Sequence, residues 1–299
     1  MIPPPFPARR LTSLSEQLAA LIQTLKSVKK EAVPWVDGTR LPWEDLDFSR
    51  RFATKVDYTA LFGHPSTGAQ VDVLQKELGL RTGDTVIDLC CGPGPHSIEL
   101  AKRGFHVIGI DVGTGAIEIA RQRAAGCPNG EPIFVIGDVC SGSTWDEVVS
   151  SLAGRRAAAA FMIRSQIDNF RPPELAVLVG HLRAVVSPGG RLLLEFTEPH
   201  KADKTCKRSW SVWNADTNIW ADSDCLVLSD RRWDADRQAA IDRYWVLHPD
   251  GRIAEYATCQ QCYERLHITR LLQAEGWAPV RFMPGDSTGT RLVAVRSGR

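Results

Sequence analysis

Long apolar runs and net charge are the two features that this sequence lacks. None of its apolar runs approaches the roughly 20 residues that cross a bilayer, so we expect no membrane partner. The 36 lysine and arginine residues nearly balance the 35 aspartate and glutamate residues, which leaves a net charge of +1. A charge this small gives no electrostatic reason to expect a nucleic acid as a partner. Hydrophobic residues make up 43% of the chain, which is enough for a globular core.

An apolar leader is also missing from the first ten residues, four of which are prolines. A secretory signal is therefore not expected, and the chain is predicted to be cytoplasmic, where its eight cysteines would be reduced thiols. Cys259 and Cys262 have the spacing of a CxxC pair, but neither a second pair nor histidines at ligand spacing accompany them. Because structural zinc takes four ligands, we expect no metal site.

A leucine seam near the N-terminus predicts a helix over residues 13–30. Ser13 and Glu16 have the spacing of a capping box at its start. Apolar side chains recur in steps of three and four residues at Leu11, Leu14, Leu18, Leu21, Leu25 and Val28. Such a seam needs a partner surface, either the body of the same chain or a second copy, so a homodimer through residues 11–30 stays open. Residues 1–60 are expected to form a helical N-terminal cover.

From Thr85 onward the sequence alternates between short apolar runs and helical segments. The expected strands cover residues 85–90, 106–112, 132–138, 157–163 and 191–196. Strands that alternate with helices form a parallel, doubly wound sheet, and both faces of such a sheet are covered. We therefore expect a Rossmann-like core over residues 61–199, completed by a helix and two strands within residues 263–299.

The alternation stops after Pro199. The following segment is polar and rich in tryptophan, and three strand-like segments come next at residues 224–232, 238–247 and 252–262. Asp250 and Gly251 separate the last two of these segments and form a hairpin signal. We predict that residues 200–262 form an antiparallel β insertion that covers the substrate.

The most informative turn follows the first strand of the core. From Val86 to Pro95 the chain reads Val-Ile-Asp-Leu-Cys-Cys-Gly-Pro-Gly-Pro, so a strand ends, glycines follow, and a helix begins with proline. A dinucleotide site would require a third glycine near the pyrophosphate, and none stands at the expected place. Asp88, just before the turn, would repel a phosphate and attract an ammonium group. The pattern favours a cationic amino-acid moiety as the ligand.

Two further carboxylates end the next two strands. Asp111 is suitably placed for a ribose diol, and Asp138 is placed to accept a hydrogen bond from an adenine amino group. Three acids at successive strand ends, without a basic residue in the turn, fit a nucleoside that carries positive charge and no phosphate. S-adenosylmethionine is such a molecule.

These motifs resemble those of class I S-adenosylmethionine-dependent methyltransferases. The resemblance covers roughly residues 50–298 and rests on Asp88-Leu-Cys-Cys-Gly-Pro-Gly94, Gly109-Ile-Asp111, Gly137-Asp138 and Pro188-Gly-Gly190-Arg-Leu-Leu-Leu. It implies an α/β fold with a doubly wound, Rossmann-like, seven-stranded sheet whose last strand is antiparallel. The stretch 42–51 resembles the entry segment of a small-molecule branch. Cys90 stands where the family has a glycine, and we expect only a tighter fit there.

The resemblance also implies roles around the cofactor S-adenosylmethionine. Asp88 would hold the methionine amino group, the backbone of Gly92 and Gly94 would pass under the methionine, and Asp111 would bind the ribose hydroxyls. The other implied contacts are Val112 against the adenine, Asp138 and Val139 at the adenine edge, the backbone near Ile163 and Arg164 on the methionyl side, Tyr58 as a lid, and Arg51 at the cofactor carboxylate.

Candidates for the acceptor side follow the fourth and fifth strands and the covering segments. Methyl transfer mainly requires alignment of the nucleophile, the methyl carbon and the sulfur, and a base only where the acceptor must lose a proton. The candidate catalytic residues are His200, Arg164, Glu195, His64 and Tyr263. Each has a structural alternative: Arg164 and Glu195 are otherwise partners in ion pairs, and the other three are otherwise surface or packing residues.

We expect methylation of a small molecule on oxygen, nitrogen or carbon. Aromatic walls from Trp210, Trp213 and Trp220 would suit an apolar acceptor and exclude water. A peptide or protein acceptor is the first alternative, because the inserted sheet offers an edge to a peptide strand. A non-catalytic assembly or regulatory subunit that binds S-adenosylmethionine is the second. A nicotinamide oxidoreductase is the third, and Asp88 argues against it.

Overall fold

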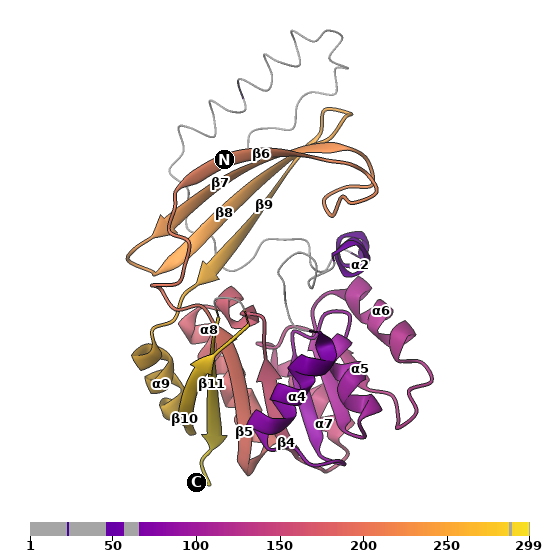
Figure 1. Cartoon of the computed structure of the whole chain (residues 1–299), viewed down its shortest axis with the longest axis vertical. Coiled ribbons are helices and arrows are strands. Elements are labelled where there is room, and N and C mark those ends of the chain that lie inside the picture. The colour runs from indigo at the N-terminus through magenta and orange to yellow at the C-terminus, as the bar shows by residue number, and fades with distance from the viewer. Residues whose placement is uncertain (1–22, 24–45, 57–65, 287–288, 299) are drawn as a thin grey trace. The chain divides into compact units, whose positions relative to one another are not determined.

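The computed structural model describes residues 46–56, 66–286 and 289–298, together with Gln23. The chain divides into two units: the larger contains residues 42–202 and 261–299, and the smaller contains residues 203–260 (Figure 1). Apart from Gln23, the seam predicted to form a helix lies outside the described residues, so neither of its two expected partners is tested. None of the helices in the described ranges is long and apolar enough to cross a membrane.

The larger unit is built on one mixed sheet with helices on both faces. Its strands are β1 (Thr85–Leu89), β2 (His106–Asp111), β3 (Ile133–Ile136), β4 (Ala157–Met162), β5 (Val186–Phe196), β10 (Trp277–Pro284) and β11 (Thr290–Arg296). Its helices are α2 (Leu46–Lys55), α4 (Thr67–Leu78), α5 (Pro95–Lys102), α6 (Thr114–Ala124), α7 (Gly142–Leu152), the 3₁₀ helix η1 (Gln166–Asn169), α8 (Pro172–Val185) and α9 (Arg265–Ala274).

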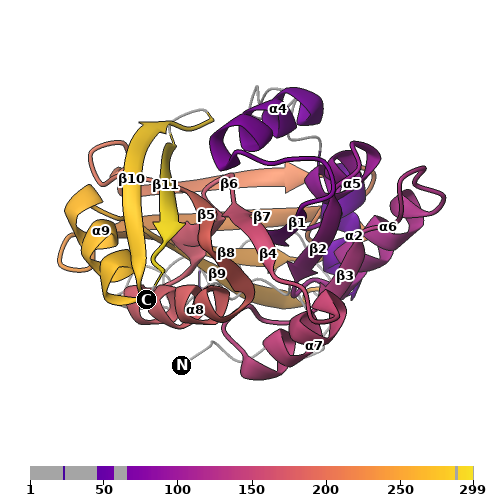
Figure 2. The ribbon, with the colours of Figure 1, turned by 90° about the horizontal axis from the view of Figure 1, so that it is seen from below.

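The strand order β10-β11-β5-β4-β1-β2-β3 can be followed in Figure 2. Strands β1 to β5 pair in parallel, and β11 pairs antiparallel with both β5 and β10. The predicted doubly wound, seven-stranded sheet with an antiparallel last strand is thus confirmed. In such a sheet the carboxyl ends of the parallel strands meet at one edge, which is where ligands bind.

Two apolar cores explain why the strands are apolar without alternation. On one face of the sheet, Leu74 of α4 and Leu100 of α5 pack with Phe161 of β4. On the other face, Leu178 of α8 packs with Ile87 of β1 in a core that α7 and α9 also enter. The alternation along β1 therefore places Asp88 on the α5 side of the sheet.

The fifth strand begins earlier than its sequence predicts. Residues 187–190, Ser-Pro-Gly-Gly, were expected to stop the preceding helix, and β5 was expected only from Arg191. The strand instead starts at Val186, which pairs with Ala157, and the register then shifts. Pro188 cannot donate to a sheet ladder and Gly189 has φ +77, so these residues bend the strand without ending it.

The smaller unit contains an antiparallel sheet, as predicted for the insertion after the fifth strand. Its strands, in the order β6-β7-β8-β9, are β6 (Lys207–Trp213), β7 (Cys225–Asp234), β8 (Ala239–Leu247) and β9 (Ile253–Gln261). Strand β6 was not predicted. It is an exposed edge strand, with Trp210 71% exposed, so burial does not impose an apolar alternation on its sequence.

Candidate functional site

The turn between β1 and α5 contains three residues in the left-handed backbone region. Cys90 and Gly92 have φ +55, and Gly94, which caps α5, has φ +69. The structure thus corrects the expectation for Cys90: its cost is a backbone conformation that favours glycine, worth about 1–2 kcal/mol, and not crowding alone.

The two glycines of this turn have different surroundings. A Cβ built on Gly94 would lie 2.8 Å from the Phe134 ring, so glycine is required there for packing. A Cβ built on Gly92 would meet nothing within 4 Å. Open space above a backbone without a side chain is what a closely approaching ligand requires, so Gly92 belongs to the candidate cofactor site.

Asp88 is buried at the end of β1, beside Ser97 of α5. It is 3% exposed, and its carboxylate accepts a hydrogen bond of 2.7 Å from the Ser97 hydroxyl of α5. Burial raises the pKa of Asp88 to about 7, and the charge of Asp111 adds to this rise, whereas Ser97 and the charge of Arg164 oppose it. A cation placed beside this carboxyl would favour its ionised form.

Asp111 connects the end of β2 to the same turn. One of its carboxylate oxygens accepts from the Gly92 amide at 2.8 Å, and the other accepts from the Gly113 amide at 2.8 Å. Burial raises the pKa of Asp111, and the two amide hydrogen bonds oppose this rise. Each oxygen keeps a second lone pair, so the carboxylate can also accept from hydroxyl groups of a ligand. Val112, next to it, is half-buried.

The third predicted carboxylate lies at the end of β3. Asp138 is exposed, and it accepts a 2.8 Å hydrogen bond from the Cys140 amide. Val139 is buried, and its carbonyl accepts from the indole nitrogen of Trp145 at 2.7 Å. The exposed carboxylate of Asp138 and the neighbouring Val139, whose carbonyl is held by Trp145, therefore lie together at the carboxyl end of β3.

The loop after β4 adds a cation that the other strand ends lack. Arg164 has φ +56, and its Nη2 lies 3.4 Å from Oε1 of Gln70 on α4. Gln70 is 2% exposed and also contacts His96 of α5 and Asp286 of the β10–β11 turn. Sequence reasoning missed Gln70, His96 and Asp286, because no spacing pattern connects residues from three distant segments.

Two of the predicted catalytic residues have structural partners. Glu195 is buried, and it accepts a hydrogen bond of 2.7 Å from Nε of Arg291 in an ion pair between β5 and β11. Tyr263 is buried, and its hydroxyl donates to the Phe170 carbonyl at 2.5 Å. For both residues the geometry favours the structural alternative over catalysis.

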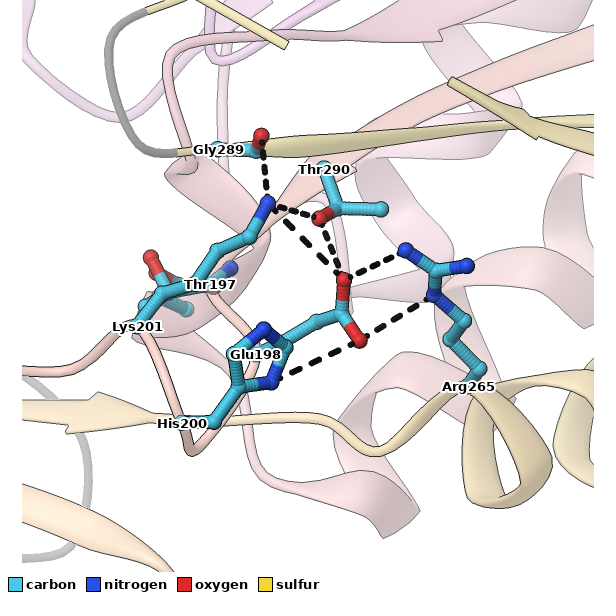
Figure 3. Close-up of polar contacts among 8 residues, drawn as sticks. Thr197, Glu198, His200, Lys201, Arg265, Gly289 and Thr290 are labelled. Carbon is cyan, nitrogen blue, oxygen red and sulfur yellow. Dashed lines mark hydrogen bonds and ion pairs between the residues drawn. The ribbon is translucent and has the colours of Figure 1, made fainter. Parts of the chain in front are cut away.

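His200 lies beside a buried carboxylate at the end of β5. Figure 3 shows His200 and Arg265 approaching Glu198, which is 6% exposed. Arg265 binds both oxygens of Glu198 at 2.9 and 3.1 Å, and Thr290 donates to it at 2.6 Å. Burial opposes ionisation of Glu198, but these hydrogen bonds outweigh it and lower its pKa.

The ring of His200 lies near this carboxylate without a hydrogen bond to it. Its Nδ1 lies 3.9 Å from Glu198, and the side chain is 69% exposed. Such a position leaves the other ring nitrogen available to solvent or to an acceptor. A distance of 3.9 Å is too long for a hydrogen bond, and the two groups form an ion pair only when the ring is protonated.

The N-terminal candidates are only partly described. His64 and Tyr58 lie outside the described residues. Arg51 is half-buried on α2, a helix that packs Ala53 against Ala116 and Ile119 of α6 and forms the ion pair Arg50–Glu118. The structure thus attaches the entry segment to the larger unit through α6.

The strand-end site coincides with a known domain family. Residues 86–190, from Asp88 through Arg164, match the family model described as a methyltransferase domain. By this match the segment is a methyltransferase domain. The match includes the turn at Gly92 and the carboxylates Asp111 and Asp138, and it ends at Gly190.

Curated relatives match only part of this chain. The ribosomal protein L11 methyltransferase of Cupriavidus metallidurans is 27% identical over 183 residues, which are 58% of this chain and 53% of that protein. The tRNA (uracil(54)-C(5))-methyltransferase of Pyrococcus horikoshii is 38% identical over 84 residues, which are 26% of this chain and 21% of that protein. The chain thus spans about half or less of these relatives.

Among solved structures, the sugar N-methyltransferase from a Streptoalloteichus species resembles a larger part of the chain. It superposes with a TM-score of 0.59 at 15% identity, covering 89% of this chain and 97% of that one. At this identity the likeness concerns the fold. It extends beyond the methyltransferase domain to most of the two units.

Proposed function

We propose that this chain binds S-adenosylmethionine at the carboxyl edge of the seven-stranded sheet and transfers its methyl group to a small-molecule acceptor. The observation that carries the proposal is the turn at Gly92: open space above a glycine, between the buried Asp88 and the amide-bound Asp111. A cationic ligand without phosphate fits this acidic turn, and a diphosphate does not.

Each strand end has a separate task in this proposal. Asp88 holds the methionine ammonium, the Gly92 backbone passes under the methionine, and Asp111 accepts from the ribose hydroxyls. Val112 and Val139 flank the adenine, and Asp138 accepts from its amino group. The partial burial of Val112 and the exposed carboxylate of Asp138 support these two roles.

The cofactor supplies an activated methyl group on a sulfonium, so the chain mainly orients the acceptor. Where the acceptor must lose a proton, His200 is the candidate base, because its ring is exposed at the end of β5 and lies near the Glu198 carboxylate, which would stabilise the protonated ring. Methylated product should then form more slowly in His200→Gln, with cofactor affinity unchanged.

A small-molecule acceptor is supported by the flat charge balance and by the likeness in fold to a sugar N-methyltransferase. A peptide acceptor is the second candidate. It is favoured by the exposed strand β6, which among the described strands pairs only with β7 and so has an edge for an added strand, and by the relative named a ribosomal protein L11 methyltransferase.

Isothermal titration calorimetry tests the cofactor half of the proposal. S-adenosylmethionine and S-adenosylhomocysteine should both bind the full chain, and Asp111→Asn should weaken both. Absence of heat with both compounds would defeat the proposal. Release of S-adenosylhomocysteine in the presence of small-molecule, peptide and tRNA acceptors then identifies the acceptor class, and such release rejects a non-catalytic role.

A further inference from the structure

Gln70 is the centre of a buried polar cluster at the carboxyl edge of the sheet. Its Oε1 accepts from His96 Nε2 at 2.6 Å and lies 3.4 Å from Arg164 Nη2. Its Nε2 donates to Asp286 at 2.7 Å. The cluster therefore connects α4, the start of α5, the loop after β4 and the β10–β11 turn.

The chemistry of these partners fixes the orientation of the Gln70 amide. Asp286 lies 2.7 Å from Arg291 and, as a carboxylate, only accepts, so the amide nitrogen of Gln70 must face it. The amide oxygen is then directed at His96 and Arg164. Burial, together with the charges of Arg164 and Arg291, lowers the pKa of His96 to about 3, so His96 is neutral and donates from Nε2.

This orientation holds the Arg164 side chain near Asp88. Strands β1 and β4 are neighbours, with Asp88 paired to Phe161, and Arg164 follows Phe161 by three residues. Arg164 and His96 both contact Gln70, and Ser97, the residue after His96, donates to Asp88. A carboxyl and a guanidinium thus lie at the ends of adjacent strands and are linked through Gln70, His96 and Ser97.

From this geometry we propose that Arg164 binds the carboxylate of the cofactor's methionine end, and that Gln70 is the positioning residue that holds Arg164 there. The inference rests on the proposed function. The ammonium and the carboxylate of an amino acid are attached to the same carbon, so their partners must be neighbours, as Asp88 and Arg164 are. A guanidinium matches a carboxylate through paired hydrogen bonds. The sequence resemblance gives this role to Arg51, and the cluster gives it to Arg164.

Three adenosyl compounds separate this role from a general structural one. S-adenosylhomocysteine carries both the ammonium and the carboxylate, decarboxylated S-adenosylmethionine carries only the ammonium, and 5′-methylthioadenosine carries neither. Dissociation constants are measured by calorimetry for the wild type, Arg164→Ala, Arg164→Lys and Gln70→Leu. Arg155→Ala is the matched control, because Arg155 is exposed and precedes the other end of β4.

We expect Arg164→Ala to weaken the binding of S-adenosylhomocysteine by about 10- to 100-fold, since an ionic hydrogen bond is lost. The dissociation constants of the other two compounds should change by less than about twofold, because these compounds carry no carboxylate for Arg164 to bind. Arg164→Lys should recover part of the lost affinity for S-adenosylhomocysteine. Gln70→Leu should weaken the binding of S-adenosylhomocysteine alone, by about 3- to 10-fold. Arg155→Ala should leave all three dissociation constants unchanged.

Three results overturn the inference. Equal weakening of all three compounds in Arg164→Ala assigns Arg164 a structural role. Selective loss of S-adenosylhomocysteine in Arg51→Ala, with Arg164→Ala unaffected, returns the role to Arg51. If the wild type binds none of the compounds, the proposed function itself fails, and the inference falls with it. Unchanged methylthioadenosine affinity shows that each variant is folded.

Discussion

The turn at residues 90–94 shows how one sequence motif contains residues with different tasks. Sequence reasoning treats Gly92 and Gly94 alike, because both permit left-handed backbone and close approach. The structure separates them: Gly94 is needed because Phe134 fills the space where a side chain would be, and Gly92 is adjacent to open space. Only the packing of a distant strand makes this distinction, so no local pattern predicts it.

Alanine substitutions should separate the two glycines. We expect Gly94→Ala to lower the free energy of unfolding by about 3 kcal/mol, because a 2.8 Å contact with Phe134 adds to the cost of a positive φ. Gly92→Ala should cost about 1–2 kcal/mol and abolish S-adenosylhomocysteine binding, since its Cβ enters the cofactor space. Gly83→Ala, also at positive φ with open surroundings, is the control that should keep binding. Urea unfolding and calorimetry measure both effects, and unchanged affinity in Gly92→Ala would contradict the assignment.

The raised pKa of Asp88 predicts a pH dependence with a definite sign. Its pKa of about 7 in the folded protein exceeds the ordinary aspartate value of 3.8, so between these two pH values the folded state binds a proton that the unfolded state has lost. Stability contributed by this group is therefore lost as pH rises from about 4 to 7. Asp88→Asn keeps an acceptor for Ser97 and should be more stable than the wild type at pH 8, on the order of 2 kcal/mol, with little difference at pH 4.

The same carboxyl should make cofactor binding weaker in acid. An ammonium ligand requires ionised Asp88, so the affinity of the wild type should rise between pH 5 and pH 8, while Asp88→Asn should bind weakly throughout. Calorimetry across this pH range, with thermal melts beside it, provides the check. A flat affinity profile in the wild type would show that Asp88 does not meet the cation.

At the scale of elements, the sequence predicts the strands that are buried between two layers of helices, and it misses the exposed strand β6. The runs at β1, β2 and β4 are apolar because both faces are buried, so periodicity finds them. Strand β6 alternates polar and aromatic residues at an exposed edge, where packing places no demand on sequence. The last hairpin is predicted by resemblance, but its ion pairs between β5 and β11 are not, because register decides which charges meet.

The ion pairs of this hairpin should be worth more than surface pairs. Arg291 is buried between Glu195 and Asp286, at 2.7 Å from each. Arg291→Met would leave two carboxyls buried without their cation, and we expect a loss of about 3–5 kcal/mol in the free energy of unfolding. Adding Glu195→Gln should recover part of this loss. If Glu195 were instead a catalytic base, Glu195→Gln alone would stop turnover in a protein of normal stability.

At the scale of the whole molecule, the described stretch 66–286 passes between the two units near residues 202–203 and 260–261. All described cofactor candidates lie in the larger unit. The smaller unit has its own aromatic cluster, in which the ring centroid of Trp220 lies 5.0 Å from that of Tyr244 and 5.6 Å from that of Tyr256. The sequence predicted the insertion and its tryptophans, but not which of them stack, because the stacking joins a loop to two separate strands.

This division predicts that damage to the smaller unit will affect the acceptor and spare the cofactor. Trp220→Ala should remove a buried aromatic, raise the KM for the acceptor at least about 10-fold, and leave the dissociation constant of S-adenosylhomocysteine within about twofold. Trp210→Ala on exposed β6 is the matched control and should change stability by less than about 0.5 kcal/mol. Parallel loss of cofactor affinity in Trp220→Ala would mean that the insertion also supports the cofactor site. If the acceptor is a peptide that adds as a strand along β6, Trp210→Ala should raise the KM for the acceptor more than Trp220→Ala does.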